Sequence, residues 1–407
     1  LDDAVEDLLN AQFHDILPGS SVRAGENNGL QILDHGLLTL NRLRARAYFA
    51  LTAAEPKAKE GEYPILVFNP NPYEWETEIT CELMLADQNW SDSMAYIPRV
   101  VDSDGNPVPA QITKEESNLS LDWRKRIVFR APLKPLSVTR YSIYMDLKPK
   151  PEKAVFRTGG SIVVDVPELG KHVEIDGNTG LLRSYRLDGK EYLKDSAFQP
   201  YFYEDNPDPW GMGGFQLAGM GRNPKPFALM QTPDGPFSGM KPVQITDDGE
   251  LFTKVEAFFV RENTRIRLEY TIYKKNNAVD VTADVFMNDA DRMLKIAVPC
   301  ALTGAYIGQT AFGTEELYTD GRECVAQRYV AVRDVGADKP CLALFNCGTY
   351  GSSYADGTVY LSLVRGASYC AHPIGDRPII PNDRFVKKID MGERTFRFRL
   401  TAAQEES

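Results

Sequence analysis

His14 and Asp15 are the neighbouring side chains best suited to chemistry in this chain of 407 residues. They stand where a helix-like run ends, just before the break at Pro18-Gly19. Imidazole is a common ligand of zinc-class ions, and an adjacent carboxylate can orient a ligand or bind sugar hydroxyls. Taken alone, however, a His-Asp pair at a helix end is more often a capping or surface pair. The two residues suggest a site without establishing one.

Tyr318 and Asp320 form the next candidate. An aromatic ring beside a carboxylate on a loop suits sugar binding, because the ring can stack while the carboxylate accepts hydrogen bonds. A β-turn with a half-buried tyrosine explains the same residues equally well. Both interpretations stay open at this point.

A third candidate is the loop at 201–214, which is rich in aromatic residues, acids and glycine. Such a loop could line a sugar cleft, with Asp205, Asp208 and Trp210 exposed. The competing interpretation, slightly favoured, is a long structural loop packed on a sheet. His372, in an Ala-His-Pro segment, is expected to be structural.

Composition limits the classes of partner. Lys plus Arg number 46 and Asp plus Glu number 57, so the formal net charge is −11. An acidic chain without a basic block argues against nucleic acid and anionic membrane as partners. No stretch reaches the ~20 consecutive apolar residues of a membrane span, and no signal peptide is visible. The chain begins with Leu1 inside a helical pattern, so we expect a cut or processed chain.

The cysteines and histidines predict no local metal site. The six cysteines include no Cys-x-x-Cys pair and lie in strand-like segments. We expect reduced, mostly buried thiols in a cytoplasmic protein, although Cys341 and Cys347 could bridge in an exported one. With four histidines and scattered cysteines, a zinc site made from one short segment is not expected.

The elements that must position these residues fall into three predicted domains. Residues 1–57 show two amphipathic helical patterns, which have no complete core of their own and must pack on a further domain. Residues 58–150 alternate with period two at short intervals, which predicts a small antiparallel β-sandwich. Residues 151–407 continue the strand signal, for example at 264–273 and 279–287, and predict one large β-sandwich.

Several motifs, in order along the chain, resemble those of glycoside hydrolase family 38, the retaining α-mannosidases. Short motifs in family order are far more specific together than any one alone. They are Gln12-Phe-His-Asp-Ile-Leu-Pro-Gly-Ser-Ser21, Val67-Phe-Asn-Pro70 followed by Trp75-Glu76, Asp176-Gly-Asn-Thr-Gly-Leu-Leu-Arg-Ser-Tyr185, Glu316-Leu-Tyr-Thr-Asp-Gly-Arg322 with Gln327-Arg-Tyr-Val330, and Asp390-Met-Gly-Glu-Arg-Thr-Phe396.

The resemblance implies roles for individual residues. His14 would be one of four protein ligands of a zinc ion, and Asp15 would bind hydroxyls of the bound mannose. Tyr318 is the best match for a tyrosine of the large β-domain that reaches the active site in the family, and its neighbour Asp320 is kept as a substrate contact. The other three zinc ligands, the nucleophile and the general acid belong to an N-terminal β/α domain that has no counterpart in this sequence.

The resemblance therefore predicts the C-terminal part of a bacterial-type α-mannosidase. The expected fold is mainly β: the end of a helical bundle, a small β-sandwich and a large sandwich resembling galactose mutarotase. The longer enzyme would hydrolyse α-mannosides with zinc, whereas this chain alone would be inactive, with its catalytic domain as its missing partner. A homo-oligomer is compatible with the sequence. The alternative is a non-catalytic carbohydrate-binding or assembly module.

Overall fold

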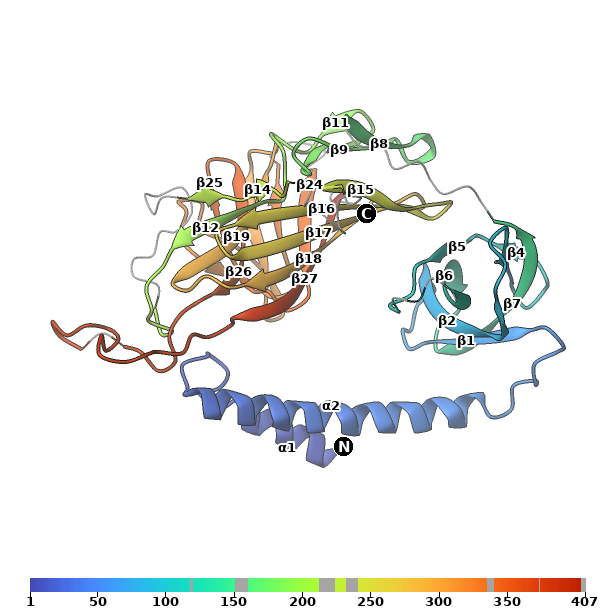
Figure 1. Cartoon of the computed structure of the whole chain (residues 1–407), viewed down its shortest axis with the longest axis horizontal. Coiled ribbons are helices and arrows are strands. Elements are labelled where there is room, and N and C mark those ends of the chain that lie inside the picture. The colour runs from blue at the N-terminus through green and yellow to red at the C-terminus, as the bar shows by residue number, and fades with distance from the viewer. Residues whose placement is uncertain are drawn as a thin grey trace. The chain divides into compact units, whose positions relative to one another are not determined.

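The computed structural model confirms a mainly β chain with two helices at its N-terminal end (Figure 1). It describes residues 1–117, 119, 121–150, 160–211, 224–231, 241–334, 340–372 and 374–403. The chain divides into two compact units, which are described separately. The first comprises Leu1–Val5, Asp34–Val155 and Asp247–Phe252, and the second comprises Glu6–Leu33, Phe156–Thr246 and Thr253–Ser407. The three-domain boundaries expected from the sequence stay a prediction.

The two helices are α1 (Asp2–Ala11) and α2 (Arg23–Thr52). Acidic residues in the first turn of α1 suit the positive end of the helix dipole. Most of the large apolar side chains of this region stay exposed, although the sequence pattern is amphipathic. The exposed ones are Leu1, Val5, Leu8, Leu9, Phe13, Leu17, Val22, Leu30, Leu37, Leu38, Leu40, Leu43, Phe49 and Leu51.

The first unit contains a small antiparallel β-structure of two sheets. Its core combines residues of both sheets, with Ile127, Phe129, Tyr141 and Ile143 almost fully buried. One sheet has the order β1-β7-β3-β4 and the other β2-β6-β5. The strands are β1 (Tyr63–Asn69), β2 (Trp75–Asn89), β3 (Met94–Val101), β4 (Pro107–Val108), β5 (Ala110–Thr113), β6 (Asp122–Leu133) and β7 (Ser137–Pro149).

The second unit is dominated by a ten-stranded and a six-stranded antiparallel sheet that share one large hydrophobic core. The ten-stranded sheet runs β14-β16-β17-β18-β27-β24-β23-β20-β21, with β15 paired to β16. Its strands are β14 (Ala228–Leu229), β15 (Val243–Asp248), β16 (Phe252–Arg261), β17 (Thr264–Tyr273), β18 (Val279–Met287), β20 (Ala305–Thr310), β21 (Gly313–Glu316), β23 (Tyr329–Arg333), β24 (Cys341–Asn346) and β27 (Gly392–Ala403).

The six-stranded sheet has the order β13-β12-β19-β26-β25-β22. Its strands are β12 (Gln199–Glu204), β13 (Lys225–Pro226), β19 (Arg292–Pro299), β22 (Cys324–Val325), β25 (Gly351–Ala355) and β26 (Thr358–Arg365). A further four-stranded sheet, β11-β10-β9-β8, opens this unit. It consists of β8 (Ser161–Val166), β9 (Lys171–Asp176), β10 (Leu182–Leu187) and β11 (Lys190–Glu191), with the short 3-10 helix η1 (Pro167–Leu169) between the first two strands.

The strand pattern read from the sequence is confirmed where it is strongest. Residues 264–273 and 279–287 form β17 and β18 with the predicted bounds. Alternate residues of β18 face the core, as a period-two pattern requires. All six cysteines are free thiols.

Candidate functional site

His14 and Asp15 lie on the loop that joins α1 to α2, within the second unit. The Nε2 atom of His14 is 3.5 Å from the Oδ2 atom of Asp15, and their side chains are 76% and 39% exposed. Ser20 donates a weak hydrogen bond of 3.5 Å from its Oγ to Oδ1 of Asp15. The His14 ring also packs on Phe13, with ring centroids 4.2 Å apart. Both residues therefore present polar atoms to the surface side by side.

The loop is held by short-range bonds and by one tight contact. The backbone N–H groups of Ile16 and Leu17 donate to the carbonyl of Phe13, at 2.9 and 3.1 Å. Gly19 adopts a φ of 75°, a left-handed conformation that glycine enters without steric cost. The side chain of Ile16 fits against Gly29 of α2, where no β-carbon intervenes. These contacts fix the orientation of the loop that carries His14 and Asp15.

Two further loops emerge at one edge of the six-stranded sheet. Strands β12 and β26 both pair antiparallel with β19, so they run in the same direction and their last residues reach the same edge. Arg365, the final residue of β26, forms an ion pair with Asp205, which follows β12. Its Nη2 atom also donates to the carbonyl of Asp208 at 3.1 Å. The backbone N–H of Ser368 donates to the carbonyl of Pro207 at 2.8 Å.

These loops carry an exposed aromatic pair. The rings of Trp210 and His372 meet edge to face with centroids 6.3 Å apart, and both side chains are largely exposed. The cleft interpretation of this loop required Asp205 and Asp208 to be exposed, which is wrong, because their side chains are only 1% and 7% exposed. The expectation that His372 is structural stays a prediction: its side chain is 60% exposed and lies 3.7 Å from Asp208. Sequence reading missed this pairing, because no local signal links residues 162 positions apart.

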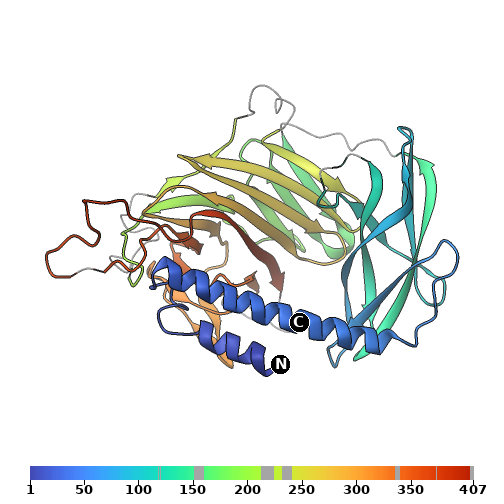
Figure 2. The same ribbon diagram turned by 60° about the horizontal axis from the view of Figure 1, so that its bottom comes forward.

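A hydrogen bond ties these loops to α2. The hydroxyl of Tyr369 donates to the carboxylate of Glu26. Burial and the neighbouring Glu26 charge raise the pKa of Tyr369 to about 12, so the hydroxyl stays protonated at neutral pH. Figures 1 and 2 both show the stretch at 366–372 and 374–391 beside the loop that joins the two helices. The His14-Asp15 loop and the two sheet-edge loops therefore lie in one region of the second unit.

Tyr318 and Asp320 lie close together in the chain, and both contact Arg322. The guanidinium carbon of Arg322 lies 3.8 Å from the centroid of the Tyr318 ring, so one face of the ring is covered. The Nε of Arg322 donates to both carboxylate oxygens of Asp320, at 2.8 and 3.0 Å. This bond lowers the pKa of Asp320. The arrangement fits the turn interpretation, and substrate contact by either residue stays a prediction.

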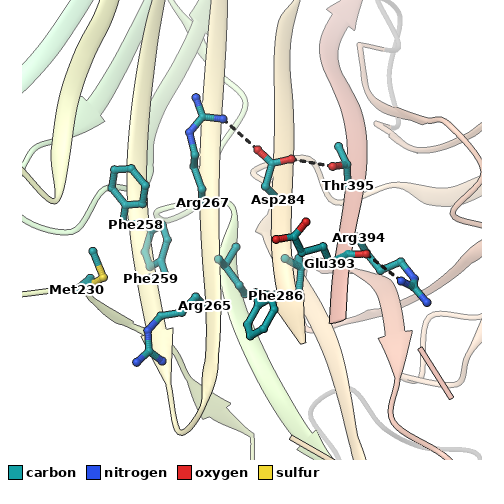
Figure 3. Close-up of a pocket in the computed structure, with 12 residues that line it drawn as sticks. Met230, Phe258, Phe259, Arg265, Arg267, Asp284, Phe286, Glu393, Arg394 and Thr395 are labelled. Carbon is teal, nitrogen blue, oxygen red and sulfur yellow. Dashed lines mark hydrogen bonds and ion pairs between the residues drawn. The ribbon is translucent and has the colours of Figure 1, made fainter. Parts of the chain in front are cut away.

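A pocket of about 470 Å³ lies on the outer face of the ten-stranded sheet (Figure 3). Apart from the Glu393 carboxylate, its polar side chains are paired with one another or with neighbours. Arg267 binds Asp284 at 3.0 Å and Glu256 at 2.7 Å, and Thr395 donates to Asp284 at 2.8 Å. Three cross-strand neighbours in register thus bind one another, which stabilises the sheet and leaves no converging set of free groups for a substrate.

The described residues do not complete a zinc site. Such a site needs three or four ligands, and within the part of the chain that the structure describes, no group of three or more His, Cys, Asp or Glu side chains is placed to hold a metal ion. His14 and Asp15 supply two donors at most. Separately, no helix within the described residues is long and apolar enough to cross a membrane.

Comparison with known proteins agrees with the motif resemblance. Residues 171–378, about half of the chain, match the family model described as the glycosyl hydrolases family 38 C-terminal domain. No curated protein sequence matches the chain. The fold of the whole chain is similar to that of a protein in the glycosyl hydrolase family 38 from Enterococcus faecalis, with 14% identity and a TM-score of 0.74, and covers 52% of that structure.

It is also similar to the structure of an alpha-mannosidase from Enterococcus faecalis V583, with 14% identity and a TM-score of 0.71. The match covers all of this chain and 50% of that one. At this identity the two structures establish the fold alone, and the chain spans about half of their length. The family match over half of the chain goes further: the chain belongs to glycosyl hydrolase family 38, through the C-terminal domain of that family.

Proposed function

We propose that this chain forms the C-terminal part of a retaining α-mannosidase and supplies His14 and Asp15 to its active site. In the longer protein, His14 is one ligand of a zinc ion and Asp15 binds hydroxyls of the mannoside. The observation that carries the proposal is the exposure of both side chains, next to each other, on a loop held firmly against α2. A ligand and a hydroxyl-binding carboxylate need this access to solvent and to a partner surface.

Two further observations support a longer enzyme. The chain covers only half of each similar structure. Its helices also leave a row of large apolar side chains exposed, which a further packed domain would bury. Retaining hydrolysis needs two carboxyl groups about 5–5.5 Å apart across the scissile bond, and we assign both to that further domain. A cytoplasmic location and a homo-oligomer remain predictions.

Variants of the longer protein test the site. His14→Ala should lower bound zinc and α-mannosidase activity together, because one ligand is lost. Asp15→Asn should keep the zinc but raise the KM for the mannoside, because a charged hydrogen-bond acceptor becomes neutral. His35→Ala, an exposed histidine on α2, is the matched control and should change neither quantity. Normal zinc content in the His14→Ala protein would refute the assignment.

The chain by itself gives a second test. The 407-residue protein should not hydrolyse a chromogenic α-mannoside, since one loop provides neither the paired carboxyl groups nor a full metal site. Turnover that survives Asp15→Asn would show that the chemistry lies elsewhere in the chain. If the longer protein also lacks activity but binds glycans, the chain is a carbohydrate-binding module instead.

A further inference from the structure

A second cavity, of about 440 Å³, lies on the ten-stranded sheet where β24, β27 and β18 run side by side. It opens on the outer face, because the exposed Arg397 and Arg399 line it while Phe398, between them, packs in the core. Small-molecule sites in proteins have volumes of this order and combine apolar walls with a few polar groups. The cavity therefore has the size of a site for one small ligand.

Arg397 brings a positive charge to this cavity without a compensating partner. Its side chain is exposed, and within the part of the chain that the structure describes no carboxylate or carbonyl oxygen binds its guanidinium group. Its neighbour on β18 in the strand ladder is Thr282, which carries no charge. On the other side, the backbone N–H of Cys347 donates to the carbonyl of Arg397 at 3.2 Å, which brings the exposed Cys347 thiol to the same cavity. The guanidinium group is thus available to an external anion.

The acidic side chains nearby are already paired with other cations. Both carboxylate oxygens of Asp280 accept hydrogen bonds from Arg399, at 2.6 and 2.8 Å. On β17, Glu269 binds Arg267 at 2.5 Å. Of the two arginines that line the cavity, Arg399 is therefore neutralised by Asp280, whereas Arg397 is not. The excess positive charge favours an anionic ligand.

Phe345 supplies an apolar wall beside this charge. Its side chain is 39% exposed, and the ring of Tyr329 on β23 packs next to it with centroids 5.4 Å apart. Phe345 lies opposite Arg399 in the strand ladder, two residues along β27 from Arg397. The bond to Asp280 draws the Arg399 guanidinium toward β18, away from the phenylalanine. An anion on Arg397 would therefore have its apolar part next to the Phe345 ring.

These groups select a carboxylate with an aromatic body. One guanidinium group forms two parallel hydrogen bonds with a carboxylate, and this geometry suits a single arginine. An aromatic ring attached to the carboxylate gains contact with Phe345, which a bare inorganic anion does not. The hydroxyl of Thr282 can donate to the bound carboxylate, since it stands opposite Arg397 on the neighbouring strand.

We propose that this cavity is a binding site for a small aromatic carboxylate. Arg397 holds the carboxylate, Thr282 donates a hydrogen bond to it, and Phe345 packs against the aromatic ring. The site uses none of the residues assigned to α-mannoside hydrolysis, so the two proposals stand or fall separately.

Fluorine NMR of 4-fluorobenzoate with the 407-residue chain tests the site. The benzoate signal should broaden and shift saturably. Arg397→Gln should weaken binding at least about tenfold, because the charged partner of the carboxylate is lost. The matched control is Arg394→Gln, at an arginine of the same strand that pairs with Asp390 outside this cavity, and it should bind as the wild type does. Neutral 4-fluorobenzamide should bind at least about tenfold more weakly than the benzoate.

The thiol of Cys347 reports where the benzoate binds. Cys347 and Cys370 are the exposed cysteines, so a Cys370→Ser chain keeps only the one in the cavity. In the reaction with 4,4′-dithiodipyridine, the Cys347 thiolate attacks the disulfide, forms a mixed disulfide and releases thiopyridone, which is followed by its absorbance. Benzoate at ten times its Kd should slow this reaction about tenfold, since about one cavity in ten stays free.

Several outcomes would overturn the site. They are a benzoate signal that does not saturate, equal affinity of the Arg397→Gln chain, equal affinity for the benzamide, or saturable binding that leaves the reaction of Cys347 unchanged. Phe345→Leu should weaken benzoate binding but not the binding of inorganic phosphate. If phosphate displaces the benzoate at equal concentration, or Phe345→Leu has no effect, the cavity does not select an aromatic ligand and the proposal is wrong.

Discussion

The Cγ2 methyl of Ile16 lies 2.6 Å from the position that a β-carbon on Gly29 would occupy. Two van der Waals carbons need a separation of about 3.5–4.0 Å, so the loop that carries His14 and Asp15 packs against α2 only because residue 29 has no side chain. Gly29 lies inside α2 although glycine has a poor helix propensity. The close approach of the loop to α2 requires a residue without a side chain at this position.

Gly29→Ala should therefore destabilise the protein by about 1–2 kcal/mol, although alanine is the better helix former by about 1 kcal/mol. The alanine methyl meets the Cγ2 methyl of Ile16, which is bonded directly to Cβ and cannot swing far from the backbone, so the whole loop must move. Urea unfolding at neutral pH measures the effect. In the double variant Gly29→Ala/Ile16→Ala, the clash disappears and the two changes should couple favourably by at least about 0.5 kcal/mol. Additive effects would contradict the contact.

The ion pair between Arg365 and Asp205 should contribute strongly to the stability of the two loops that follow β12 and β26. Arg365→Met leaves a carboxylate that is 1% exposed without its cation, which should cost about 3–5 kcal/mol in unfolding free energy. The control is Arg384→Met, which breaks an exposed pair: the side chains of Arg384 and Asp383 are 68% and 65% exposed. This variant should change the free energy of unfolding by less than about 0.5 kcal/mol. Similar losses in the two variants would show that burial does not set the value of these pairs.

Lys171 should make stability rise with pH. Burial lowers its pKa to about 7, and its Nζ donates to the carbonyls of Tyr273, Asn276 and Ala278 at 2.8, 3.2 and 2.8 Å. Its ordinary pKa is 10.5, so between about pH 7 and 10.5 the unfolded chain binds more protons than the folded one, and raising the pH favours folding. Below pH 7 both states are protonated and this contribution is constant.

Urea unfolding of the wild type and of Lys171→Met at pH 7, 8.5 and 10 tests this effect. The difference between the two proteins isolates the lysine from all other titrating groups. The wild type should gain stability relative to the variant as the pH rises. A constant difference would mean that the ammonium is solvated in the folded protein.

Lys295 and Glu323 form a second buried pair, on the six-stranded sheet. The Lys295 side chain is fully buried, and its Nζ also donates to Ser353 at 2.7 Å. Burial lowers the pKa of Lys295, whereas the nearby Glu323 carboxylate raises it, so the charged form of the lysine depends on Glu323. Glu323→Gln should cost about 3–5 kcal/mol in unfolding free energy, and Lys295→Met/Glu323→Gln should recover most of the loss. A double variant no more stable than Glu323→Gln would contradict this dependence.

The sequence alone determined the features that depend on near neighbours. Alternation of apolar and polar residues predicted β17 and β18 to the residue, because facing a core on one side imposes a period of two. Pro18-Gly19 indicated a break in the helical run, because proline and glycine disfavour its continuation, but α1 already ends at Ala11, before His14 and Asp15. The motif around His14 and Asp15, with others in order, led to the family that the comparison then established.

Only the tertiary structure decided which distant residues meet. Trp210 and His372 come together because β12 and β26 flank β19 in the same direction, and Asp208 is buried because Arg365 draws its loop inward. Local sequence patterns do not encode such contacts, because the order of the strands depends on the free energy of the whole sandwich core. The sequence therefore located a strand and its faces, whereas packing decided its neighbours and the side chains exposed at its ends.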